Sequence, residues 1–162
     1  MRAGFSAAVI KGLERRGLVK RELRERVRDP LAHIKHGEDV ELAPTVDQER
    51  VIAALEKSLC ARAFPGALLH GVTGSGKTLV YMHLVRSALA QGRSAIVLVP
   101  EIALAWQMVR RFKQHFGDDV AVLHSQLSAG ERYDTWKRLR RGEPPIVIGA
   151  RSAVLAPLPD VG

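Results

Sequence analysis

The sequence is poor in cysteine, in long apolar runs and in acidic residues. Cys60 is the only cysteine among 162 residues, which excludes an internal disulfide and a cysteine-based zinc site. No apolar run approaches the ~20 residues that a membrane-spanning helix needs. The first residues contain neither a long apolar segment nor a small-residue cleavage site. We therefore expect a cytoplasmic protein with no signal peptide and no membrane partner.

The shortage of acidic residues leaves a net charge of +8, and most of it lies at one end. Residues 1–36 contain ten lysines and arginines but four acids, so they hold six of the eight net charges. A basic end beside a near-neutral body indicates a polyanionic partner, most often nucleic acid. The alternative is a solvated charged face, which charge alone leaves open. The basic stretch "WKRLRRG" at 136–142 is read as a solvated helix end, favoured by the helix dipole.

Apolar periodicity over residues 45–162 predicts alternating helices and strands. Thr45 can cap a helix over 46–63, and Gly92 can close a helix over 77–90. Further helices are expected at 101–116 and 128–142, strands at 67–70, 94–99, 120–124 and 146–150, and a loop at 155–162. Elements of these lengths in this order form right-handed β-α-β units. The predicted fold class is therefore α/β with a parallel sheet.

A glycine-rich stretch between an expected strand and an expected helix fits the P-loop pattern G-x-x-x-x-G-K-[ST] at every fixed position. Its glycines let backbone N–H groups surround a β-phosphate, and the helix N-terminus adds a positive dipole. Lys77 can reach the β- and γ-phosphates and the Thr78 hydroxyl can ligate Mg²⁺, so these two are the predicted catalytic residues. A nucleotide, taken as ATP, with Mg²⁺ is the predicted cofactor, but the motif alone does not choose between kinase, GTPase, translocase and helicase. The predicted nucleotide cradle comprises Gly71, Val72, Thr73, Gly74, Ser75, Gly76, Lys77 and Thr78.

Three further stretches leave the carboxyl ends of expected parallel strands, where open α/β sheets bind ligands. They are "VLVPEIALAWQM", "VLHSQLSAGERYDTW" and "IVIGARSAVLAP". Each offers hydroxyls, helix N–H groups or an arginine suited to phosphate. Repeated phosphate-sized sites beside a nucleotide site favour a strand of nucleic acid lying across this edge.

The amino-terminal residues predict a separate small unit. Ser6 can cap a helix that starts at Ala7 and ends before Gly17, and "LVKRELRERVRD" then allows one or two short strands. A helix, a glycine and a basic strand resemble the last helix and wing of a winged helix-turn-helix, whose last helix can enter a DNA groove. A basic linker hairpin is the alternative.

In sum these motifs resemble the superfamily 2 helicases, and within them the family of primosomal replication-restart helicases typified by PriA (primosomal protein N′). The resemblance rests on "LLHGVTGSGKT", "VLVPEIAL" with "QM", "VAVLHS" with "GERYD" and "W", and "IVIGARSA" with "APLP", in this order. It implies a winged-helix remnant at 1–36, a connector at 37–44, and the amino-terminal part of a RecA-like motor domain at 45–162.

The same resemblance implies residue roles. Gln48, in "TVDQ", matches the glutamine that reads adenine. The resemblance places Pro100, Glu101, Arg151 and Ser152 on a single-strand track. The charge of the basic end, rather than the resemblance, predicts DNA contacts for Arg15, Arg16, Lys20 and Arg21. Leu79 and Ala105-Trp106 depart from the family's usual Glu and Thr-Pro. Trp106 either stacks on a base or packs its helix.

The family's next segment, an apolar strand ending in Asp-Glu-Glu-His that completes the magnesium site, does not occur before Gly162. Asp160 follows Pro-Leu-Pro rather than an apolar strand, so we reject it as a substitute. We therefore expect a fragment that binds nucleotide and DNA but neither hydrolyses nor unwinds. Single-stranded and forked DNA and other primosome proteins are the implied partners. Two rivals remain: a P-loop small-molecule kinase, and a DNA-binding module with an idle P-loop.

Overall fold

The structure, a computed structural model, describes residues 6–20, 29–31, 34, 43–63, 66–100 and 102–162. The predicted wing strands and the connector at 37–44 fall largely outside these residues, as do Arg21 and Glu101. The predicted domain boundaries therefore stay predictions. The described helix α1 (Ala7–Arg15) has the expected start after Ser6, and Gly17 follows it in a left-handed conformation with φ 70°.

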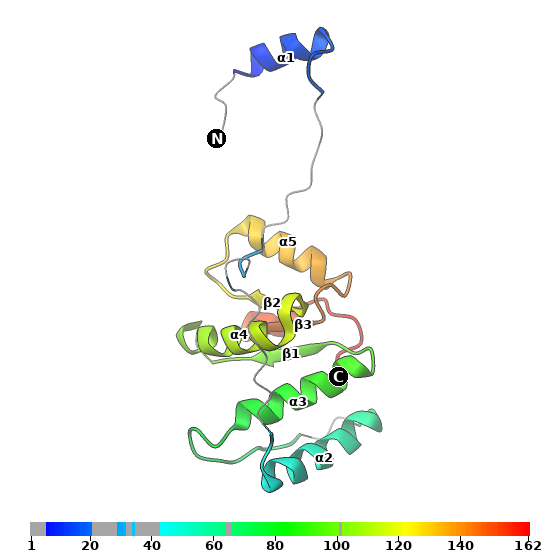
Figure 1. The fold of residues 1–162 in the computed structure, drawn as a ribbon, viewed down its shortest axis with the longest axis vertical. Coiled ribbons are helices and arrows are strands. Elements are labelled where there is room, and N and C mark those ends of the chain that lie inside the picture. Colours follow the sequence, from blue (N-terminus) through cyan, green and yellow to red (C-terminus); the bar gives the residue numbers. More distant parts are fainter. Residues whose placement is uncertain (1–5, 21–28, 32–33, 35–42, 64–65, 101) are drawn as a thin grey trace.

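A three-stranded parallel sheet forms the centre of the body (Figure 1). Its strands are β1 (Ala95–Leu98), β2 (Val120–Leu123) and β3 (Ile146–Gly149), in the order β1-β3-β2. In register, Ile146 lies beside both Ala95 and Val120. All residues of β2 and β3 are buried, as expected of strands covered on both faces. The α/β class and the parallel sheet are thus confirmed.

Two apolar clusters cover opposite faces of the sheet, because successive side chains of a strand alternate between faces. On β3, Ile146 and Ile148 join a cluster with Val85 of α3 (Lys77–Ala90) and Phe112 of α4 (Ile102–Phe116). Val147 joins the other cluster, with Leu139 of α5 (Ala129–Leu139). The helix α2 (Val46–Cys60) packs on α3. Figure 1 shows α2, α3, the sheet and α5 one after another along the long axis of the body.

A short piece of the basic amino-terminal region belongs to this core. Leu31 has no exposed surface and lies in the cluster with Phe112 and Val120. Its N–H donates to Asp29 Oδ1 at 2.9 Å, and the Ile34 N–H donates to its carbonyl at 2.9 Å. The α/β body therefore includes a residue that the sequence pattern places with the basic end.

The prediction of a strand at 67–70 is wrong. These residues belong to no strand, and the Leu68 side chain is 92% exposed. The reason is pairing: among the described residues no strand lies beside this segment. A cavity of about 380 Å³ lies next to β1, and Gly66, Leu59, Val85 and Ile96 are among its lining residues.

The end of the chain approaches β1 from the same side as this cavity. Ser94 N–H donates to the Asp160 carbonyl at 2.9 Å, and Gly162 N–H donates to the Ser94 carbonyl at 2.8 Å. The pairing of Ser94 with Val161 is parallel. A second difference from the sequence pattern is the 3₁₀ helix η2 (Arg151–Leu155), which directly follows β3.

Candidate nucleotide site and nucleic-acid interface

The P-loop folds tightly against the start of α3. Gly74 and Gly76 have φ of 83° and 80°, a left-handed conformation that glycine adopts without strain. A Cβ on Gly76 would collide with the Gln48 amide nitrogen, and one on Gly71 would lie 2.7 Å from Ser75 Oγ. The helix begins at Lys77, so its first N–H groups, which lack intrahelical partners, face the loop. Unpaired N–H groups at the start of a helix can bind an anion, and phosphate binding here stays a prediction.

The Lys77 ammonium lies over the loop rather than in solvent. Its Nζ donates to the Gly71 carbonyl at 2.7 Å and to the Val72 carbonyl at 2.8 Å. An ammonium carries three donors, so a phosphate oxygen can be the third partner. The ammonium thus contacts the P-loop backbone, and its role toward phosphate stays a prediction.

Gln48 joins α2 to the P-loop. Its Oε1 accepts from the Thr45 N–H at 2.8 Å, which completes a capping box at the start of α2. Its Nε2 donates to the Ser75 carbonyl at 3.0 Å. Each end of the carboxamide makes one hydrogen bond, which leaves a second acceptor site on Oε1 and a second N–H on Nε2. The structure places Gln48 beside the loop, which the sequence spacing alone could not establish.

The site offers one side chain for a magnesium ion and no carboxylate cluster. Thr78 is the second residue of α3, and within the described ranges no group of three or more His, Cys, Asp or Glu side chains could hold a metal. Asp160 lies 3.5 Å from Arg62 Nη2 and 3.9 Å from Arg93 Nε, beyond the carboxyl end of α3. A helix of this length spans about 20 Å. Asp160 is thus too far from the loop to serve the nucleotide.

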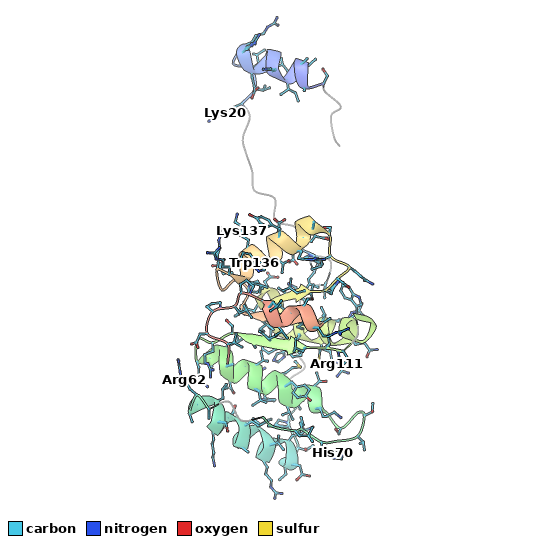
Figure 2. The ribbon with its side chains drawn as sticks, turned by 180° about the vertical axis from the view of Figure 1, so that it is seen from behind. Lys20, Arg62, His70, Arg111, Trp136 and Lys137 are labelled. Atoms are coloured by element: carbon cyan, nitrogen blue, oxygen red, sulfur yellow. The ribbon has the colours of Figure 1, made fainter. Side chains whose placement is uncertain are left out.

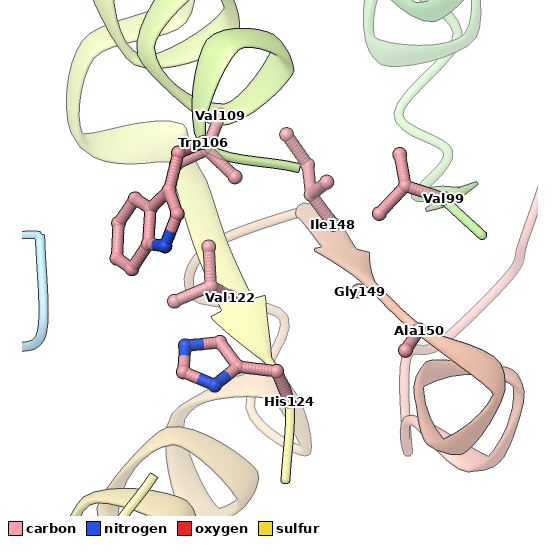
Figure 3. A pocket seen from close by; sticks show the side chains of 8 residues that line it. All are labelled: Val99, Trp106, Val109, Val122, His124, Ile148, Gly149 and Ala150. Carbon is pink, nitrogen blue, oxygen red and sulfur yellow. The ribbon is translucent and has the colours of Figure 1, made fainter. Parts of the chain in front are cut away.

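The three stretches at the strand ends come together, as the sequence predicted. Val99 and His124 directly follow β1 and β2, and Gly149 ends β3 and is followed by Ala150. These residues line one small apolar hollow with Trp106 of α4 (Figure 3). A Cβ on Gly149 would overlap the Leu123 carbonyl, so glycine is required there.

Most predicted DNA contacts are exposed where the structure describes them. Pro100 follows β1, and Arg151 and Ser152 open η2 at the same edge of the sheet. Arg15, Arg16 and Lys20 are exposed on or just after α1. The structure therefore groups Pro100, Arg151 and Ser152 at one edge of the sheet.

His124 is the residue at this edge that the sequence did not single out for function. Both ring nitrogens are covered, and neither has a hydrogen-bond partner in the described part of the chain. The Trp106 ring meets the imidazole edge-on, with centroids 5.9 Å apart. Burial lowers the pKa of His124; Glu131 opposes this shift and Arg132 adds to it. Only the three-dimensional packing of α4 on β2 could have revealed this pair.

Comparisons with known proteins identify this fold. The family model of the DEAD/DEAH box helicases matches residues 45–160. The replication restart protein PriA of Bacillus subtilis (strain 168) is 46% identical over 158 residues, which is 97% of this chain and 20% of that protein. The protein of the same name from Chlamydia trachomatis is 49% identical over 121 residues, 74% of this chain and 16% of the relative. The chain thus spans about a fifth of the length of these curated relatives.

None of the helices in the described ranges is both long and apolar enough to cross a bilayer. The helicase match covers the P-loop, the sheet and the three strand-end stretches, and the relatives extend the similarity over the basic end. The chain therefore belongs to the DEAD/DEAH box helicase family, within which it is similar to one part of the replication restart proteins PriA.

Proposed function

We propose that this chain is the ATP-binding part of a 3′-to-5′ DNA helicase of the PriA type that acts in replication restart. The main support is the position of Lys77, whose ammonium donates to P-loop carbonyls at the start of α3. The chain also belongs to a helicase family. Family membership favours this function over the small-molecule kinase considered above. The activity of the whole protein is inferred from relatives of which this chain spans about a fifth.

The nucleotide roles follow from the loop geometry. Bound ATP with Mg²⁺ supplies the phosphoanhydride bond whose hydrolysis drives such motors. Lys77 would hold the β- and γ-phosphates, Thr78 the magnesium ion and Gln48 the adenine. The contact of Gln48 with the Ser75 carbonyl places its carboxamide against the loop, which supports this assignment.

The nucleic-acid roles belong to the carboxyl edge of the sheet. Arg151, Ser152 and Pro100 are exposed there, and with Glu101 they would contact the backbone of a single strand. Arg15, Arg16, Lys20 and Arg21 would add sequence-independent contacts to phosphates, as the basic charge of the amino-terminal end suggests. Forked DNA and primosome proteins are the proposed partners of the longer helicase.

The 162-residue chain by itself is expected to bind nucleotide without turnover. A magnesium site of this kind needs an acidic side chain close to the loop. Asp160 instead faces Arg62 and Arg93 at the far end of α3. DNA-stimulated phosphate release by this chain at the rate of a complete motor would contradict the assignment.

Arg151→Ala tests the strand-end surface. Anisotropy of labelled oligothymidylate at several salt concentrations should show weaker binding and a log–log salt slope smaller by about 0.7, the value for one lost contact with a single strand. Arg111→Ala, which removes an exposed arginine from α4, is the matched control and should behave as the wild type. Equal binding by the two variants would exclude Arg151 from the track.

A further inference from the structure

The outward face of α5 has an unusual composition. Thr135 and Leu139 are buried, so they mark the side of α5 that packs on the body. Side chains at i, i+3, i+4 and i+7 share one helix face. On the opposite side this spacing aligns four residues, here called the α5 stripe: Tyr133, Trp136, Lys137 and Arg140. Figure 2 shows Trp136 and Lys137 at the surface of this helix.

The stripe exposes two aromatic rings. Tyr133 is 65% exposed and Trp136 is 41% exposed, although the buried residues of this helix already provide its contact with the core. The Arg140 guanidinium carbon lies 5.8 Å from the centre of the Trp136 ring, a cation–π contact that holds both planar groups together at the surface. The rings are therefore presented to solvent by an ordered helix.

The charge of the stripe has one sign. It contains Lys137 and Arg140, and Arg141 is exposed directly after it, but it contains no carboxylate. The acids of the helix are Glu131 and Asp134, and Asp134 borders the stripe because it lies three residues before Lys137. Glu131 is engaged at the helix start, where it accepts from the Ser128 N–H at 2.9 Å. Basic side chains interleaved with exposed aromatics complement a polyanion that also carries flat apolar rings.

The stripe begins close to the strand-end surface. Only three residues lie between His124, which directly follows β2, and Ser128, which caps α5. Arg132 ties this corner together, since its Nη2 donates to the Ser125 carbonyl at 3.3 Å. From this edge α5 runs back along the face of the sheet that the Leu139 cluster covers, whereas Val85 of the P-loop helix belongs to the cluster on the other face. The stripe is thus distinct from the nucleotide site.

We propose that the α5 stripe binds a segment of single-stranded nucleic acid, with unpaired bases stacked on Trp136 and Tyr133 and phosphates close to Lys137 and Arg140. The proposal rests on the nucleic-acid partner proposed above and extends its path beyond the strand ends. A single strand is favoured over a duplex because paired bases already stack on one another and cannot offer a free face to the rings. An acidic peptide would satisfy the cations but leave the two rings without a planar partner.

The two tryptophans of the chain, Trp106 and Trp136, allow a direct test. Trp106→Phe leaves Trp136 as the sole reporter, and Trp136→Phe leaves Trp106. Each variant is titrated with oligothymidylate while indole fluorescence is followed. Stacking predicts saturable quenching of Trp136 in the Trp106→Phe protein. No quenching of Trp136, with labelled oligothymidylate bound at the same concentrations, would overturn the proposal.

Affinity variants separate stacking from charge. Trp136→Ala and Tyr133→Ala should each weaken oligothymidylate binding by about 5- to 150-fold, the range for loss of one stacked base, whereas Trp136→Phe should retain most of the affinity. Replacing Lys137 and Arg140 by glutamine should reduce the salt slope by about 1.4. The matched control replaces Arg50 and Lys57, two exposed cations of α2, by glutamine and should leave the slope unchanged.

Further readouts decide between the remaining outcomes. If an oligoglutamate of equal charge quenches Trp136 and competes as well as oligothymidylate, the stripe is an acidic-peptide surface and the proposal fails. ATP binding is also measured in each variant, so that a failure of the α5 stripe can be told from a failure of the proposed nucleotide-binding function. Stripe variants that bind both ATP and oligothymidylate as the wild type does would refute the stripe alone. If Trp136→Ala fails to fold, the glutamine variants and the Trp136 reporter still decide.

Discussion

At the end of β2, the covered imidazole of His124 links the stability of the domain to pH. Burial lowers the pKa of His124 in the folded state, so the unfolded chain binds the proton more readily. The groups that face the ring are Trp106 of α4 and Glu131 and Arg132 of α5. A neutral His124 therefore makes its full contribution to the free energy of unfolding above the unfolded-state pKa of about 6.5. This contribution is lost as the pH falls toward the lower pKa of the folded state.

His124→Gln should remove part of this pH dependence. When the pH is lowered from 7.5 to 5.5, the urea midpoint of the wild type should decrease by more than the midpoint of His124→Gln. The reason is that only the wild type has a buried imidazole at this position that resists protonation. His70→Gln, at an exposed position, is the control and should follow the wild type. Parallel curves for wild type and His124→Gln would show that His124 does not contribute.

At the scale of elements, the segment around Leu31 forms part of the α/β core. Leu31 has no exposed surface in the cluster with Phe112 and Val120, so Leu31→Ala should reduce the free energy of unfolding by about 2–5 kcal/mol. Leu68→Ala, at a 92% exposed position, should change it by less than about 0.5 kcal/mol. Urea denaturation measures both. Equal effects of the two substitutions would place Leu31 outside the core.

Local sequence signals predicted most of the helices and strands of the body. Thr45 forms the expected capping box at the start of α2, and short continuous apolar runs mark β2 and β3. The P-loop could be predicted as well, because its backbone conformation demands glycines at fixed positions.

What the sequence could not predict depends on long-range pairing. An apolar run such as residues 67–70 becomes a strand only when another strand lies beside it, and Leu68 is instead exposed. The burial of Leu31 and the contact of His124 with Trp106 likewise arise between segments far apart in the chain. The α5 stripe follows helical spacing, but its exposure could be established only once the buried side of α5 was known.

At the scale of the whole molecule, the P-loop and the strand-end surface are built on one parallel sheet. The cavity beside β1 lies between that strand, α2 and α3, and residues 160–162 already pair with Ser94 next to it. Among the described strands β1 lies at an edge of the sheet, so this cavity borders an edge strand.

The central claim is that this molecule binds ATP with Mg²⁺ through Lys77, and calorimetric titration of ATP into the chain tests it most directly. The wild type should show one saturable site. Lys77→Ala should bind at least tenfold more weakly, because a hydrogen bond to a charged group contributes about 1.5–3 kcal/mol. Lys57→Ala, which removes an exposed lysine from α2, should bind as the wild type does. Equal affinities of folded wild type and folded Lys77→Ala for ATP would contradict the account.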